Sequence, residues 1–221
     1  MLPVLQSITN QFVETAVEVF VGDSEEISCK AGCGACCRQP VPLAEIEVYQ
    51  IAELVENMPE QRRTKIKQKF ADACEKLNKI NWFERLENVF SSDSNAKSDE
   101  VQKLALEYFR QNIACPFLEE ESCSIHQDRP LSCREFLVTS PAENCQNPMP
   151  ENITHVDMKF KVSNVVRRLW KTQNLSNKDV VTMIYALEWS KQKPDQFAEK
   201  RDDEWLREFF NYFSKGENAD K

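Results

Sequence analysis

The chain has 221 residues, of which 41% are hydrophobic, and it contains nine cysteines. A chain of this length can bury an ordinary core, so it does not need the disulfide staples of a small secreted domain. Lys and Arg number 28 against 36 Asp and Glu, and the resulting net charge of -8 disfavours binding to nucleic-acid phosphates.

The sequence pattern argues against three further classes of protein. Residues 1–15 carry no Lys or Arg ahead of an apolar run, so we expect no secretory leader. No stretch approaches the roughly 18 consecutive apolar residues of a membrane span. The four glycines are too few and too scattered for a Gly-rich phosphate-binding loop. We therefore expect a cytoplasmic protein with no membrane or nucleic-acid partner, in which clustered thiols bind metal rather than form disulfides.

The first predicted element is a helix. Apolar residues at helical spacing predict it over residues 3–21, with Gly22 as its end. A cysteine-rich loop at residues 29–41 follows. Pro42 and two acidic residues after it then suit the first turn of a second helix, which runs to about Asn57.

Pro59 can begin a third, long helix, whose apolar stripe includes Cys74. We expect Cys74 to be buried there as a small hydrophobic side chain, because free cysteine commonly packs in this way. The polar residues 91–98 predict an exposed loop. A further helix is predicted from Ser98 to about Asn112.

The rest of the chain divides into loops and helices. Residues 115–150 are rich in Pro, Cys, Asn and Ser without a sustained period, which predicts irregular loops. Helical patterning returns at residues 156–173, 177–191 and 195–214, and residues 216–221 suit a frayed tail.

Together these elements predict a mostly α-helical fold with helices around irregular, cysteine-rich metal-binding loops. We expect a single domain over residues 1–221, with the metal-binding loops at 29–41 and 113–147 and a helical C-terminal part at 156–215.

Eight of the nine cysteines form two groups that are far apart in the sequence. The first group reads Cys29-Lys-Ala-Gly-Cys33-Gly-Ala-Cys36-Cys37, and the second consists of Cys115, Cys123, Cys133 and Cys145. Thiolate is a metal ligand, and a bound metal lowers the thiol pKa enough to ionise it at neutral pH. Eight thiolates suffice for two tetrahedral zinc sites, or for one four-iron cluster and a zinc. We therefore expect the two groups to close round one metal-centred cluster.

The residues beside the cysteines suit such a site. Gly32 and Gly34 flank Cys33 and let the backbone turn tightly. The side chains of Cys36 and Cys37 diverge in most backbone conformations, so one of them serves a second metal or is not a ligand. Nearby positive charges can offset the roughly -2 charge of four thiolates on a divalent ion, and they are carried by Lys30, Arg38, Arg129 and Arg134.

Further residues follow the cysteines in a recognisable pattern. They read Pro40-Val-Pro-Leu43 and Glu45 after the first group, then Cys115-Pro-Phe-Leu118, Cys123-Ser-Ile-His126 and Arg129-Pro-Leu-Ser-Cys133-Arg-Glu-Phe136. This pattern resembles the YkgJ-like cysteine-cluster family with its CxxCxxCC signature, over about residues 29–145. The first spacing is three residues rather than two. His126 stands where a tyrosine is expected, and we do not count it among the ligands.

The resemblance implies chelation of zinc or iron, including iron in a [4Fe-4S] cluster. Carried over position by position, it implies metal ligands at Cys29, Cys33, Cys36, Cys37, Cys115, Cys123 and Cys133, with Cys145 as the eighth. Arg129, Pro130 and Arg134 would then shape the loop around the sulfur atoms. Some relatives are associated with flagellin lysine methylation, but the family has no general activity, so the resemblance implies a site and not a reaction.

Three functions remain open. The first is a structural or storage zinc site, and the second is an iron–sulfur protein that transfers electrons or belongs to a methylation-type protein-modifying enzyme. The third is a zinc-stapled module for an unknown protein partner. The spacing from Cys29 to Cys36 also occurs in radical enzymes that use S-adenosylmethionine, but those need a strand-and-helix barrel and more glycine. No general base stands out, so we assign no catalytic residue.

Overall fold

The computed structural model describes residues 1–21, 26–30, 32–91, 97–149, 151–156, 158, 160–169, 181–193, 195 and 201–214. Helices dominate this part and its strands are two residues long, which confirms the prediction of a mostly α-helical fold. The longer helices are α1 (Leu2–Val21), α2 (Glu45–Glu56), α3 (Glu60–Asn78), α4 (Trp82–Ser91), α5 (Lys97–Arg110), α7 (Val162–Leu169) and α9 (Asp202–Ser214). Among the helices described, none has the length and apolar character that crossing a membrane requires.

Short elements carry the chain between the helices. They are β1 (Pro42–Leu43), β2 (Leu118–Glu119), β3 (Ser122–Cys123), η1 (His126–Asp128), α6 (Leu131–Arg134), η2 (Ala142–Gln146), β4 (Val181–Thr182), η3 (Met183–Tyr185) and α8 (Ala186–Gln192). β1 pairs antiparallel with β4, and β2 pairs antiparallel with β3. The two residues between β2 and β3, Glu120 and Glu121, have φ of 49° and 57°, which is the turn geometry that matches strand twist in a tight hairpin.

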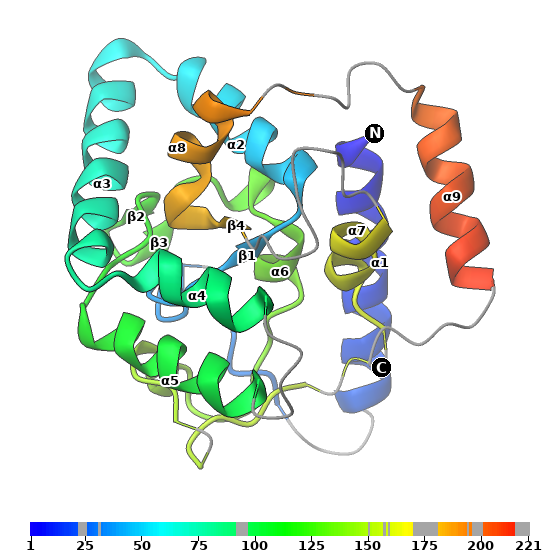
Figure 1. The fold of residues 1–221 in the computed structure, drawn as a ribbon. Coiled ribbons are helices and arrows are strands. Elements are labelled where there is room, and N and C mark those ends of the chain that lie inside the picture. The colour runs from blue at the N-terminus through cyan, green and yellow to red at the C-terminus, as the bar shows by residue number, and fades with distance from the viewer. Residues whose placement is uncertain are drawn as a thin grey trace.

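Three sets of helices surround the irregular segments (Figure 1). α1, α7 and α9 lie on the right of the view, where α7 contacts both of the others. On the opposite side α2 contacts both α3 and α8, while α4 and α5 form a contacting pair below them. The short helix α6 lies between these sets and contacts α1 and α7.

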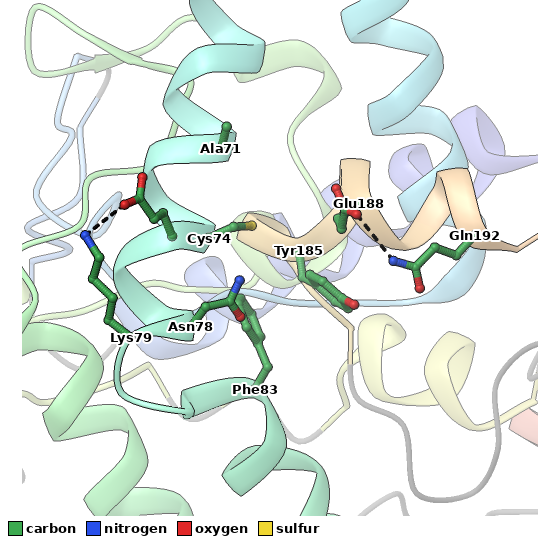
Figure 2. A pocket seen from close by; sticks show the side chains of 9 residues that line it. Ala71, Cys74, Asn78, Lys79, Phe83, Tyr185, Glu188 and Gln192 are labelled. Atoms are coloured by element: carbon green, nitrogen blue, oxygen red, sulfur yellow. Dashed lines mark hydrogen bonds and ion pairs between the residues drawn. The ribbon is translucent and has the colours of Figure 1, made fainter.

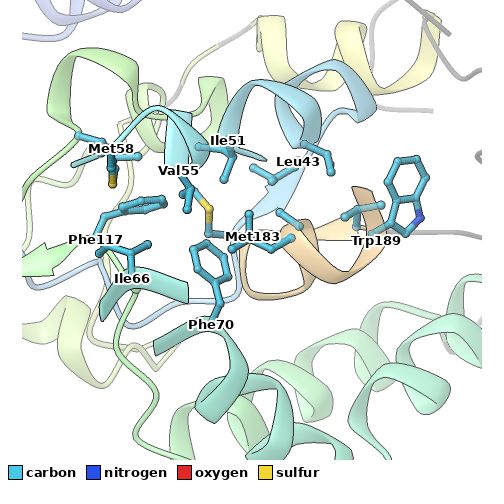
Figure 3. Packing of buried hydrophobic residues seen from close by; sticks show 14 residues of the cluster. Leu43, Ile51, Val55, Met58, Ile66, Phe70, Phe117, Met183 and Trp189 are labelled. Carbon is cyan, nitrogen blue, oxygen red and sulfur yellow. The ribbon is translucent and has the colours of Figure 1, made fainter. Parts of the chain in front are cut away.

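The core between α2, α3 and α8 also supports the cysteine loops (Figure 3). Phe117, from the second cysteine segment, is fully buried and packs edge-on against Phe70 of α3 at a centroid distance of 5.6 Å. Cys115 and Cys123 pack against the same cluster. Burying an aromatic side chain of this size stabilises a fold by about 1.5–3 kcal/mol, so this helical core anchors one end of the loop.

Two further cores confirm the predicted apolar stripes. Leu5 of α1 is fully buried in the core that α1 shares with α7 and α9. Leu77 of α3 and Tyr108 of α5 are buried in the core beneath α4. Trp82 is buried in the same core, where its indole nitrogen donates a hydrogen bond of 2.9 Å to the carbonyl oxygen of Leu104.

Several element boundaries differ from the predictions. Pro42 lies in β1 rather than in the first turn of α2, and within the predicted helix 177–191 residues 181–182 form β4. These two corrections have one cause, because β1 and β4 pair with each other. Val181 and Thr182 are β-branched and suit a strand, so tertiary pairing outweighs the helical period.

Other helices are shorter than predicted. The long helix α3 ends at Asn78, and Asn81, at φ 51°, lies between it and α4. The apolar period of the sequence did not predict α4 as a separate helix. Among the described residues of 156–173, only Val162–Leu169 is helical, and α9 begins at Asp202 rather than at residue 195. The predicted positions that lie outside the described residues are Gly22, most of the 91–98 loop, residues 170–180, residues 196–200 of the predicted last helix and the tail at 216–221.

Candidate metal centre

The two cysteine groups meet in the fold. A cavity of about 280 Å³ lies between them, and its wall includes all eight predicted ligands: Cys29, Cys33, Cys36, Cys37, Cys115, Cys123, Cys133 and Cys145. All nine cysteines of the chain are free thiols. The two groups therefore lie close together, as a shared metal-centred cluster requires, while the metal-centred cluster itself stays a prediction. The role of the cysteines as ligands also stays a prediction.

The thiols are close together but are not arranged as a finished coordination site. Among the residues described, no three or more His, Cys, Asp or Glu side chains are arranged so that they could hold a metal ion as they stand. Instead, the Cys37 thiol lies within hydrogen-bonding reach of both Cys36 and Cys123. Metal binding therefore requires the sulfur atoms to exchange protons for the metal and to close around it.

Positive charge borders the cavity. Its wall includes Lys30, Arg129 and Arg134, together with His126, whose pKa is lowered by burial and by the two arginines, and it contains no Asp or Glu among the described residues. The Nε atom of Arg129 is buried and has no hydrogen-bond partner in the described part of the chain, while its Nη1 contacts His126 Nε2. A guanidinium N–H group left without an acceptor beside several thiols fits a site that becomes anionic when the thiols ionise.

The chain around Cys29 is extended and lies beside the last part of the second cysteine segment. The backbone N–H of Ser28 donates to the Val138 carbonyl oxygen at 3.0 Å, and its hydroxyl donates to the Thr139 carbonyl oxygen at 2.9 Å. The Val138 N–H in turn donates to Cys29 Sγ at 3.4 Å. Burial raises the pKa of Cys29, and this N–H bond opposes the rise by stabilising the thiolate.

A tight turn holds the other cysteines of the first group against the β2–β3 hairpin. The Cys37 N–H donates to the Gly34 carbonyl oxygen at 3.0 Å. Arg38 donates to the same oxygen at 3.1 Å and forms an ion pair of 2.7 Å with Glu121 of the hairpin. A Cβ atom at Gly34 would lie only 2.5 Å from the Glu121 carbonyl oxygen, so glycine is required for this close approach.

Backbone contacts connect the second group to the first. The Cys115 N–H donates to the Cys37 carbonyl oxygen at 2.7 Å. Cys123 lies on β3, and the N–H of the next residue, Ser124, donates to the Phe117 carbonyl oxygen at 2.9 Å. The hairpin that carries Cys123 is thus fixed both to the helical core and to the first cysteine turn.

Cys133 lies on α6, which is held by a buried carboxylate. Glu47 of α2 is 1% exposed, and its two oxygens accept the backbone N–H groups of Leu131, at 2.7 Å, and of Ala44, at 2.8 Å. At the other end of α6, Arg134 donates to the Arg129 carbonyl oxygen at 3.0 Å. The orientation of Cys133 toward the cavity therefore depends on residues outside the cysteine motifs.

We expect Glu47→Gln to lower the free energy of unfolding by about 1–3 kcal/mol, because one of the two N–H donors would then face an amide NH₂ instead of an oxygen. Urea denaturation measures the loss. Glu53→Gln, at an exposed position of the same helix, is the control and should change stability little. Equal stability of the two variants would show that Glu47 does not hold α6.

The thiols differ in how readily they ionise. The hydrogen bond from Cys37 lowers the pKa of Cys123 to about 6 and that of Cys36 to about 7. The charge of Arg129 contributes to both of these shifts. Burial has the opposite effect on Cys115 and Cys145, whose pKa values it raises to about 12. The cavity therefore combines thiols that ionise near neutral pH with thiols that hold their protons.

Metal affinity should rise with pH as a result. Cys115 and Cys145 are protonated at neutral pH in the metal-free protein, and a metal ion must displace these protons. Each displaced proton contributes about a tenfold change in apparent affinity per pH unit, so we expect the affinity to increase at least tenfold between about pH 6 and about pH 7. Competition with a chromophoric chelator measures this, and a flat profile would contradict ligation by these thiols.

Cys74 lies away from the cavity, as predicted. Its Sγ donates to the Ile184 carbonyl oxygen at 3.1 Å, and it borders an open groove between α3 and α8 (Figure 2). It packs against the apolar core beneath α4 but is only half-buried, so the prediction that it is buried among apolar side chains is confirmed in part. The groove leaves one side of this helix uncovered, which the apolar stripe alone could not indicate.

A comparison with protein families matches residues 28–157 to the family described as "CxxCxxCC: Putative zinc- or iron-chelating domain". No significant match was found among curated proteins or among solved structures. The family match spans both cysteine groups and all eight cavity cysteines, and its description supports metal binding. The chain belongs to the CxxCxxCC family.

Proposed function

We propose that the chain is a metal protein that holds zinc or iron, the latter as an iron–sulfur cluster, through the eight cavity cysteines. One observation carries the proposal: the cavity gathers all eight cysteines of the two groups and leaves out Cys74. Soft thiolate donors suit zinc and iron–sulfur clusters, whereas magnesium and calcium require oxygen donors. The proposal includes a cytoplasmic location, since free thiols persist in a reducing compartment.

The surrounding residues support metal retention more directly than catalysis. The part of the cavity wall that the structure describes contains no carboxylate, so paired-carboxylate chemistry has no candidate residues there. Arg129 stabilises thiolate at Cys36 and Cys123 by its charge. A bound zinc would cross-link the loops, and a bound iron–sulfur cluster would also accept and release electrons.

Anaerobic purification followed by elemental analysis, acid-labile sulfide measurement and a visible spectrum tests the proposal in one preparation. We expect zinc or iron to stay with the protein through gel filtration. Iron should come with sulfide and a broad visible absorbance, whereas zinc should leave the protein colourless. A helical, monodisperse protein that carries neither metal, and takes up neither when reduced and supplied with them, contradicts the proposal.

A further inference from the structure

The cavity cysteines belong to two different packing environments. Cys145 is buried together with Ala35 and Val138, and three more cysteines, Cys29, Cys33 and Cys36, pack against this cluster. The cluster lies where residues 26–36 meet the segment after α6, and the hydrogen bond from Val138 to Cys29 Sγ joins these two segments. Four thiols therefore share one apolar environment at one end of the cavity.

The other thiols lie against a separate core. Cys115 and Cys123 pack on the cluster formed by α2, α3 and α8, which does not include any cysteine of the first environment. Cys37 joins these two, because its carbonyl oxygen accepts the Cys115 N–H at 2.7 Å and its thiol lies within hydrogen-bonding reach of Cys123 as well as of its neighbour Cys36. Cys133 is close to Cys115 and Cys123, whose charges contribute to raising its pKa after the larger effect of burial.

The electrostatic neighbours divide in the same way, with one thiol in common. After burial, the thiols that raise the pKa of Cys145 are Cys36, Cys29 and Cys33, and none of these comes from the second environment. Cys36 is the exception, since it also acts on Cys115 and Cys133, and Cys37 and Cys123 act on it. It therefore lies at the boundary between the two sets, directly before Cys37 in the chain.

Resting on the proposed function, we infer that the cavity holds two neighbouring four-thiolate centres rather than one. The first is formed by Cys29, Cys33, Cys36 and Cys145, and the second by Cys37, Cys115, Cys123 and Cys133. Each set has the four thiolates that a tetrahedral zinc site or a cubic iron–sulfur cluster needs. The adjacent pair Cys36 and Cys37 is divided between the centres, which resolves how two neighbouring side chains can both be ligands.

Positive charges lie near both centres, and Arg129 acts on Cys36 of the first as well as on Cys123 of the second. Lys30 lines the cavity beside the first set. Arg129 lowers the pKa of Cys123, and Lys69 acts in the same direction on Cys115, in the second set. Two centres with about -2 charge each would otherwise repel one another across a small cavity, so these cations favour simultaneous occupation.

Selective loss of metal tests this division. The purified protein, prepared anaerobically, is compared with Cys145→Ser, Cys123→Ser and the control Cys74→Ser by elemental analysis and by counting thiols that react with a chromogenic disulfide reagent. We expect the wild type to hold two centres and expose only Cys74. Cys145→Ser and Cys123→Ser should each lose about half of the metal and expose three further thiols, and Cys74→Ser should keep all of its metal.

One centre in the wild type with several reactive thiols, or complete metal loss in both cavity variants, would overturn the two-centre assignment while leaving metal binding intact. A wild type without metal, and with its thiols reactive, would instead contradict the proposed function. If a variant does not fold, stepwise removal of metal from the wild type by a chelator provides the second test. Two phases, each exposing about half of the cavity thiols, support two centres, and a single phase contradicts them.

Discussion

Replacing Cys133 by Ser should remove about half of the bound metal and make residues 115–145 sensitive to protease. A hydroxyl is a poor ligand for zinc or iron compared with thiolate, so the second centre would lose one of its four bonds. The segment around Cys133 contains only short elements, although Leu131 and Val138 are fully buried. Its order should therefore depend on the metal as well as on Glu47.

The helices should survive this substitution, because their cores bury apolar side chains without help from the cavity. Circular dichroism should show nearly unchanged helix content, while limited proteolysis should cut within residues 115–145. Cys74→Ser is the matched control, since Cys74 lies outside the cavity. If Cys133→Ser keeps full metal occupancy and a protected loop, or if Cys74→Ser loses metal, the assignment of ligands is wrong.

Gly34→Ala should separate the two cysteine groups. The added Cβ would overlap the Glu121 carbonyl group, with 2.5 Å to its oxygen, and backbone cannot move aside as a flexible side chain can. We expect the free energy of unfolding to fall by about 3 kcal/mol and metal affinity to fall by at least tenfold. Urea denaturation and chelator competition measure the two effects.

Gly32→Ala is the control for this substitution, because both glycines flank the same cysteine. A Cβ at Gly32 would meet nothing within 4 Å, and the only cost is the left-handed backbone at φ +82°. That cost is about 1–2 kcal/mol, with little expected effect on metal affinity. A Gly32→Ala variant that loses more metal affinity than Gly34→Ala would show that the turn, and not the hairpin contact, brings the groups together.

Much of the helical fold could be predicted because its signals are local. The spacing of Leu5 on α1 and of Leu77 on α3 follows from the period of a helix, and both side chains are buried as that period requires. The cysteines could also be found from the sequence, since their spacing is itself the signal. Their meeting in one cavity followed from chemistry, because two ligand-rich loops can share a centre.

What could not be predicted depends on contacts between distant residues. Glu47 lies 84 residues from Leu131, whose N–H it accepts, and an acidic residue in the first turn of a helix has a sufficient local explanation. The ion pair between Arg38 and Glu121 is equally remote in sequence. Val181 forms a strand only because β1 lies beside it. None of these contacts leaves a periodic pattern in the sequence. The residues that support the cysteine loops could therefore be identified only from the fold.

X-ray absorption spectroscopy at the edge of the bound metal tests the central claim most directly, because it reports the atoms around the metal without any variant. Ligation by the cavity cysteines predicts about four sulfur neighbours per metal ion and no nitrogen or oxygen neighbour, whether the metal is zinc or iron in a cluster. Nitrogen or oxygen neighbours in that shell would bring in His126 or water as ligands, and would contradict a centre made of thiolates alone.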